Sequence, residues 1–256
     1  MTNNIYENSV VEDMPVKWKI ERRVEYREVH YDDEHWRILR EKRREALRVM
    51  EALARQGLSS IVHGSIARGD VNPKSDIDVF IPFMVPSYRV ELALEMAGIK
   101  PYKRFIVQAT PGHAPKAYIA LDEEELRMVS FPLAKLSRNE YEFYKFGGLL
   151  DLEGLRRNER VPGVDKRLVL IEPTSYGHRE SPVIGRESIV ARIIGVSVET
   201  VLERVRVLSR RDEIGRTGVF LYYELSPDES FEKALAKLAR ENQYVRRVLQ
   251  NRGSLL

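Results

Sequence analysis

The stretch that decides the fold is SIVHGSIARGDVNPKSDIDVFI, residues 60–81. An apolar run leads into Gly64-Ser65, and a polar segment separates this dipeptide from a second apolar run containing Asp76 and Asp78. Alternate side chains of a strand point to opposite faces, so the two carboxylates share one face and the intervening Ile77 points into the core. Two carboxylates this close repel each other unless a cation lies between them. The pattern therefore predicts a hairpin that holds a divalent cation.

The residues before the two aspartates are of types that bind an anion such as phosphate. Gly64 lets the backbone approach a phosphate without a Cβ in the way, and the Ser65 hydroxyl adds a donor. Arg68 can supply positive charge against a reacting phosphate. Each feature alone is weak, because Gly-Ser dipeptides are usually turns and Asp-x-Asp is usually a solvated strand face. Their combination within one hairpin predicts a site for a nucleotide triphosphate with Mg²⁺.

Gly64-Ser65-Ile66-Ala67-Arg68-Gly69 followed by Asp76-Ile77-Asp78-Val79-Phe80 resembles the signature of the DNA polymerase β-type nucleotidyltransferase superfamily. The likeness is closest to its archaeal tRNA CCA-adding and minimal nucleotidyltransferase branches, and covers roughly residues 33–135. The resemblance implies that Gly64 and Ser65 hold the triphosphate and that Asp76 and Asp78 bind Mg²⁺ or Mn²⁺. An acceptor hydroxyl would then attack the α-phosphorus of an NTP, expected to be ATP, and expel pyrophosphate.

One element of the family pattern is missing. The superfamily carries a third carboxylate on a later strand, whereas the matching segment, residues 126–132, contains Arg127 and no acid. Glu125 and Asp122, at either side of the preceding turn, are the candidate replacements. Both also fit an exposed acidic turn, which is the more frequent situation. If Arg127 faced Asp76 and Asp78, it would compete with a metal for their charge.

The rest of the pattern predicts an α/β (α+β) fold, with a mixed nucleotidyltransferase sheet and flanking helices. A helix is expected from Asp32-Asp33 to Gly57, and the acidic turn at residues 122–125 is expected to join two strands as a hairpin. We predict an N-terminal extension at 1–32, a nucleotidyltransferase domain at 33–135, a connecting region at 136–180 and a mainly helical domain at 181–256.

The C-terminal part resembles a winged-helix regulator. A short helix from Glu187 to Ile194, a turn at Gly195 and a second helix capped by Ser197 are followed by an apolar strand at 219–225, and a long amphipathic helix is expected at 231–249. Glu199 and Glu203 dilute the positive charge of this module, so contact with DNA or RNA and packing against a partner both stay open. The arginines that would contact nucleic acid are Arg204, Arg206, Arg210, Arg211 and Arg216.

The amino-acid composition narrows the classes of function and of binding site that remain. The net charge is only +3 over 256 residues, so nucleic-acid binding requires local basic patches. The absence of Cys excludes thiolate metal sites and disulfides, and no apolar run is long enough to span a bilayer, so a cytoplasmic protein is expected. Residues 176–180 suggest a surface loop, and His63 a satisfied histidine at a strand end.

Two functions fit these expectations. The first is an enzyme that transfers a nucleotide onto RNA, protein or a small molecule. The second is a nucleic-acid-binding transcriptional regulator whose nucleotidyltransferase domain senses nucleotide or is inert. Neither the acceptor, the oligomeric state nor the preferred base can be deduced from the residues.

Overall fold

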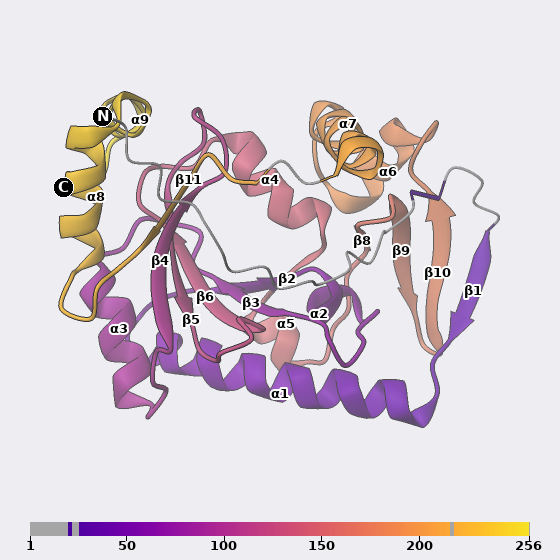
Figure 1. The fold of residues 1–256 in the computed structure, drawn as a ribbon. Coiled ribbons are helices and arrows are strands. Elements are labelled where there is room, and N and C mark those ends of the chain that lie inside the picture. The colour runs from indigo at the N-terminus through magenta and orange to yellow at the C-terminus, as the bar shows by residue number, and fades with distance from the viewer. Residues whose placement is uncertain (1–19, 22–25, 216–217, 256) are drawn as a thin grey trace.

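The computed structural model describes residues 20–21, 26–215 and 218–255 (Figure 1). Its first half contains β1 (Arg27–His30), α1 (Asp33–Arg55), β2 (Ile61–His63), α2 (Ser65–Arg68), β3 (Ile77–Phe80), α3 (Ser87–Met96), β4 (Lys103–Gln108), β5 (Lys116–Ala120) and β6 (Arg127–Pro132). Its second half contains α4 (Arg138–Phe146), β7 (Leu149–Asp151), α5 (Leu152–Arg156), β8 (Gly163–Val164), β9 (Val169–Thr174), β10 (Gly177–Pro182), α6 (Glu187–Ile194), α7 (Val198–Ile214), β11 (Leu221–Glu224), α8 (Phe231–Glu241) and α9 (Gln243–Arg252).

A seven-stranded mixed sheet forms the centre, in the order β11-β4-β5-β6-β3-β2-β7. Only β3 and β6 run parallel; the other neighbours are antiparallel. Ile77, Val79 and Val129 point to the face covered by α1, α3 and α8, where the largest core cluster lies. Figure 1 shows α1 running along this face. Asp78 points to the opposite face, on which α4 packs through Tyr144. The α/β fold class is thereby confirmed.

Local signals predicted the elements around the site correctly. Asp32 caps α1 by accepting a hydrogen bond from the backbone N–H of His35, and Gly57 has a φ of 69° just beyond the helix end. Strands β5 and β6 form the expected antiparallel hairpin across the acidic turn. The periodic apolar positions of α1 lie against the sheet, and most of its charged positions face outward; Arg43 is buried and donates to the Ile66 carbonyl.

A smaller antiparallel sheet, in the order β1-β10-β9-β8, lies beside the large one. It shares a second core with α6 and α7 through Leu168, Leu170 and Val190. The loop predicted at residues 176–180 is wrong, because most of it forms strand β10. Two polar side chains there have partners in neighbouring segments: the Tyr31 hydroxyl lies 2.7 Å from His178 Nδ1, and Arg167 forms an ion pair with Glu180.

The C-terminal part departs from a winged helix. Helices α6 and α7 form as expected, with Gly195 at a φ of 68° between them and Ser197 capping α7. The expected wing strand instead pairs with β4, because Leu221 and Tyr223 pack against the first core. The predicted single long helix is also wrong: Asn242 ends α8 and caps α9 by accepting hydrogen bonds from Tyr244 and Val245.

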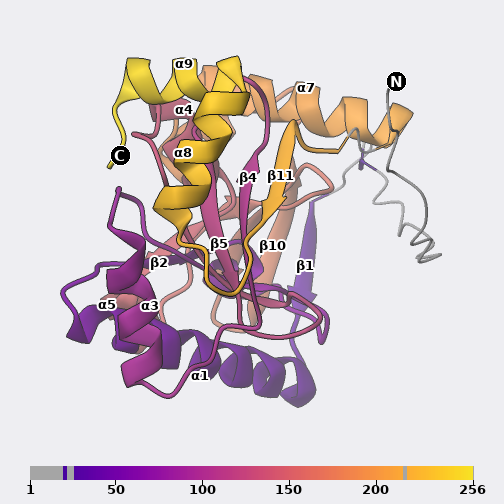
Figure 2. The ribbon, with the colours of Figure 1, turned by 60° about the vertical axis from the view of Figure 1, so that its left-hand side comes forward.

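Strands β7 and β11 come from outside residues 33–135, so the sheet extends beyond the span predicted for the nucleotidyltransferase domain. Phe231 of α8 packs against Phe131 of β6 in the main core. Figure 2 shows α8 lying close to β4 and β11. The boundaries at residues 135 and 180 stay predictions, but the sheet and the main core cross both of them.

Candidate active site

The turn after β2 is built on glycines. Gly64 has a φ of 75°, a conformation that other residues rarely adopt, and a Cβ there would meet nothing within 4 Å. Its N–H donates to the Gly148 carbonyl at 3.0 Å, and its own carbonyl accepts from Ala67 and Arg68 at 3.1 Å. Ser65 starts the short helix α2. The turn is therefore open on the side of the missing Cβ and fixed on the other.

The two aspartates lie at the start of β3. Asp78 is within the strand and Asp76 immediately precedes it, while Ile77 between them is buried in the main core, as predicted. Ser75 accepts from the Asn72 N–H at 2.9 Å and so closes the turn leading to Asp76. The Ile77 N–H donates to Leu126 at 2.7 Å, which ties the strand start to β6.

The electrostatics of the pair fit a cation ligand. Burial and the charge of Asp78 raise the pKa of Asp76, and burial raises the pKa of Asp78. Both carboxylates are therefore held in a place that disfavours their negative charge. A divalent cation would relieve this cost, with further oxygen ligands from phosphate and water. Asp76 and Asp78 are the residues that would hold it.

His63 lies directly beside the pair. Its Nε2 atom is 3.9 Å from Asp78 Oδ2, and its ring packs edge-on against Tyr144 at 4.9 Å between centroids. Burial and the charges of Lys116 and Arg68 lower its pKa to about 4. His63 is thus a neutral imidazole at pH 7 and adds no positive charge to the acids.

Lys116 and Tyr144 pack next to His63, in the side-chain cluster that borders the two aspartates. Lys116 Nζ donates to the Tyr144 hydroxyl at 2.8 Å, and Tyr144 stacks on Phe80 at 3.9 Å between ring centroids. Burial lowers the pKa of Lys116 to about 8. This half-buried lysine lies on the same sheet face as Asp78, and it was not identified from the sequence.

Lys166 is a second residue that sequence reasoning missed. It is exposed in the turn between β8 and β9, and its positive charge lowers the pKa of both Asp76 and Asp78. Lys42 of α1 acts similarly on Asp76 while donating to the Ser75 carbonyl at 2.7 Å. Nothing in the sequence near residue 166 indicates this placement, because a separate strand hairpin delivers it.

Arg68 does not take the role expected for it. Its side chain is 5% exposed and donates to the Gly147 carbonyl at 2.6 Å and to Asp70 Oδ2 at 2.7 Å. The guanidinium therefore links the Gly64 turn to the Gly147–Gly148 turn. We replace its predicted catalytic role with a structural one.

This placement predicts the effect of Arg68→Ala. Removing the guanidinium leaves the Asp70 carboxylate and the Gly147 carbonyl buried without their donor, so we expect a loss of about 2–4 kcal/mol in the free energy of unfolding. Urea denaturation measures this loss. Arg68→Lys should not restore stability, because one ammonium cannot span both acceptors. A variant as stable as the wild type that loses only activity would contradict the structural role.

The proposed third carboxylates lie elsewhere. Asp122 Oδ2 accepts from Arg127 Nε at 2.7 Å, and Glu125 pairs with Lys103 at 3.0 Å. Arg127 also reaches Glu45 of α1, so it lies on the face opposite Asp78 and does not compete for a metal. The position paired with Asp78 on β6 is Met128. Among the described residues, no three or more His, Asp or Glu side chains are grouped to hold a metal.

Residues 43–149 match the family model of the nucleotidyltransferase domain. The matched span contains Gly64, Ser65, Asp76 and Asp78, and the match supports the superfamily suggested by the sequence signature. The match begins inside α1 and ends at the first residue of β7, so it covers less than half of the chain. No curated protein and no solved structure matches the chain significantly.

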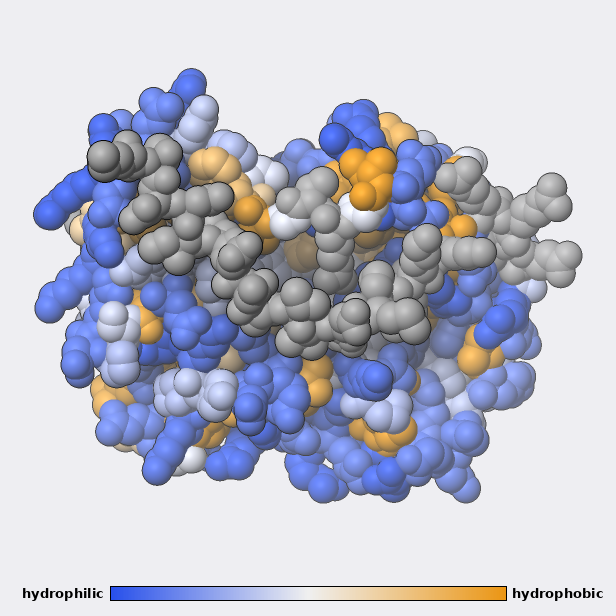
Figure 3. Space-filling view, in the orientation of Figure 1, coloured by the Kyte–Doolittle hydropathy of each residue, from blue (hydrophilic) through white to orange (hydrophobic). Residues whose placement is uncertain are grey.

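The arginines expected to contact nucleic acid divide into three groups. Arg206, Arg210 and Arg211 are exposed on α7. Arg204 instead turns inward over the Phe143 ring at 4.9 Å, and burial lowers its pKa to about 10. Arg216 lies outside the described residues. Figure 3 shows hydrophobic side chains over α6 and α7, and Ile193 and Leu202 are exposed there, so the outer surface of this module is not uniformly basic.

In the part of the chain that the structure describes, no helix has both the length and the apolar character needed to cross a bilayer.

Proposed function

We propose that this protein transfers a nucleotide from an NTP, with ATP as the expected donor, to an acceptor hydroxyl in a reaction that requires Mg²⁺ or Mn²⁺. The observation that supports this proposal most directly is the pair Asp76 and Asp78, within the span that matches the nucleotidyltransferase model. The pair lies at the start of β3, which is the strand next to the one that leads into Gly64-Ser65. Their raised pKa values and the nearby Lys166 describe a site that suits a cation bound to phosphate oxygens.

The chain's own residues would act mainly by positioning. Asp76 and Asp78 hold the cation, which neutralises charge on the phosphates when bound. Gly64 and Ser65 offer an open turn for the triphosphate, and Lys166 supplies positive charge from the side of the small sheet. The acceptor oxygen forms a bond to the α-phosphorus while the bond to the pyrophosphate oxygen breaks, and the hydroxyl proton is released. RNA, protein and small molecules are all acceptors of the right chemistry.

Labelled nucleotides test this proposal. The purified protein is incubated with each α-labelled NTP, Mg²⁺ or Mn²⁺, and a cell extract separated into RNA, protein and small molecules. We expect label in one acceptor class, with ATP giving the strongest signal, and none when EDTA is present. Failure to label any product from any of the four NTPs with either metal would overturn the proposal.

A further inference from the structure

Four arginines lie along the outward side of α1. Arg40, Arg44, Arg48 and Arg55 are all exposed, and their spacing of four, four and seven residues places them on one side of an α-helix. At a rise of about 1.5 Å per residue they extend over about 22 Å. We call this set the α1 arginine stripe.

The stripe has no ionic partners within the described residues: no carboxylate of these ranges pairs with any of its four guanidinium groups. On the same helix Arg37 is ion-paired, since it lies 2.6 Å from both Glu34 and Glu41. Like charges four residues apart destabilise a helix. A row of unpaired arginines on a helix that pairs Arg37 therefore indicates an external anion.

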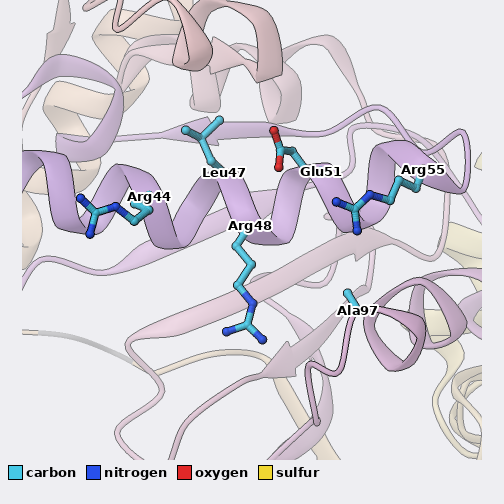
Figure 4. A pocket seen from close by; sticks show the side chains of 6 residues that line it. All are labelled: Arg44, Leu47, Arg48, Glu51, Arg55 and Ala97. Atoms are coloured by element: carbon cyan, nitrogen blue, oxygen red, sulfur yellow. The ribbon is translucent and has the colours of Figure 1, made fainter.

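A groove accompanies the stripe between α1 and the end of α3. It has a volume of about 450 Å³ and is lined by Arg44, Leu47, Arg48, Glu51, Arg55 and Ala97 (Figure 4). Glu51 is the acid of this lining, and Arg156 of α5 lies 3.0 Å from it, so its charge is balanced. Arg89 of α3 is exposed near the same end and donates to the Gln56 carbonyl at 2.8 Å. The groove is thus positively charged along its length.

We propose that the α1 arginine stripe binds the phosphate backbone of a nucleic acid. A strand presents phosphates at regular intervals, which suits a row of cations, and the planar arginine fork matches phosphate oxygens. A membrane surface fits less well, because Leu47 is the largest apolar side chain of the groove and is half-buried against the core. The stripe contains neither Asp76 nor Asp78, so this proposal concerns a surface other than the proposed site of nucleotide transfer.

Fluorescence anisotropy of the full chain tests the proposal with labelled single-stranded RNA, duplex RNA and duplex DNA of mixed sequence. With four phosphate contacts, affinity should fall about 50- to 150-fold between 50 and 200 mM salt. Arg44→Glu/Arg48→Glu/Arg55→Glu should weaken binding at least about 30-fold at low salt and flatten the salt slope by about 2–3. The neutral Arg44→Gln/Arg48→Gln/Arg55→Gln variant should flatten it similarly if charge reversal prevents folding.

The matched control is Lys233→Glu/Arg240→Glu/Arg247→Glu, which makes the same charge change at exposed positions of α8 and α9. It should bind within about threefold of the wild type, since these positions lie outside the stripe. The proposal is overturned if none of the three nucleic acids binds, if the α8–α9 variant loses as much affinity as the α1 variants, or if binding occurs only to vesicles of anionic lipid.

Discussion

Asp78→Asn will reduce nucleotide transfer by at least about 100-fold, the loss expected when a group that organises transition-state charge is removed. Asparagine has the size of aspartate but offers one neutral oxygen, so it cannot hold a divalent cation against phosphate. Asp76→Asn should act in the same direction. Initial rates with α-labelled ATP, taken over a range of Mg²⁺ concentrations, measure both losses.

The loss should not come from unfolding. Burial raises the pKa of Asp78, so the metal-free folded protein holds its charge at a cost at pH 7, and a neutral side chain removes that cost. The thermal midpoint of Asp78→Asn without metal should equal or exceed that of the wild type.

Asp122→Asn and Glu125→Gln are the matched controls, because their carboxylates pair with Arg127 and Lys103. Both should retain activity within about threefold, as expected for surface ion pairs. A loss as large as that of Asp78→Asn in either control would show that the third carboxylate exists and that its assignment here is wrong.

Glu142→Ala will destabilise the protein by about 2–4 kcal/mol, because it removes the acceptor that attaches α7 to α4. Glu142 Oε2 accepts from the Ser197 N–H at 2.9 Å, from the Ser197 hydroxyl at 2.6 Å and from the Thr200 hydroxyl at 2.7 Å. These donors lie at the start of α7. Without the carboxylate, the helix end and a buried threonine hydroxyl lose their shared partner.

The contacts of Glu142 also predict how the stability of the protein depends on pH. Burial alone would raise the pKa of Glu142, but hydrogen bonds from Ser197 and Thr200 outweigh it and lower the pKa from 4.5 to about 2. The stability that Glu142 contributes is therefore complete above its unfolded pKa and is lost as pH falls from about 4.5 toward 2. Urea denaturation at pH 7 and pH 3 should give a larger difference for the wild type than for Glu142→Gln. Equal differences would contradict this account.

Much of the site could be predicted because its signals are local. Strand periodicity alone places Ile77 in the core, and the Gly64-Ser65 dipeptide indicates a turn, which the structure forms with a positive φ at Gly64. The failures are long-range. The sequence predicts that Arg68 faces a phosphate, because its partner Gly147 is far away in the sequence and nothing near Arg68 indicates that contact. Lys166 is missed because it comes from a different hairpin. The wing was expected from its apolar strand, whose pairing with β4 depends on a core that residue order does not reveal.

Titration of Mn²⁺, followed by electron paramagnetic resonance in the presence of a non-hydrolysable ATP analogue, tests the central claim most directly. We expect the wild type to immobilise Mn²⁺ only when the analogue is present or far more tightly with it, and the Asp76→Asn/Asp78→Asn variant to lose this signal while remaining folded. Equal Mn²⁺ binding by the wild type and the double variant would contradict the assignment of the two aspartates as the cation and nucleotide site.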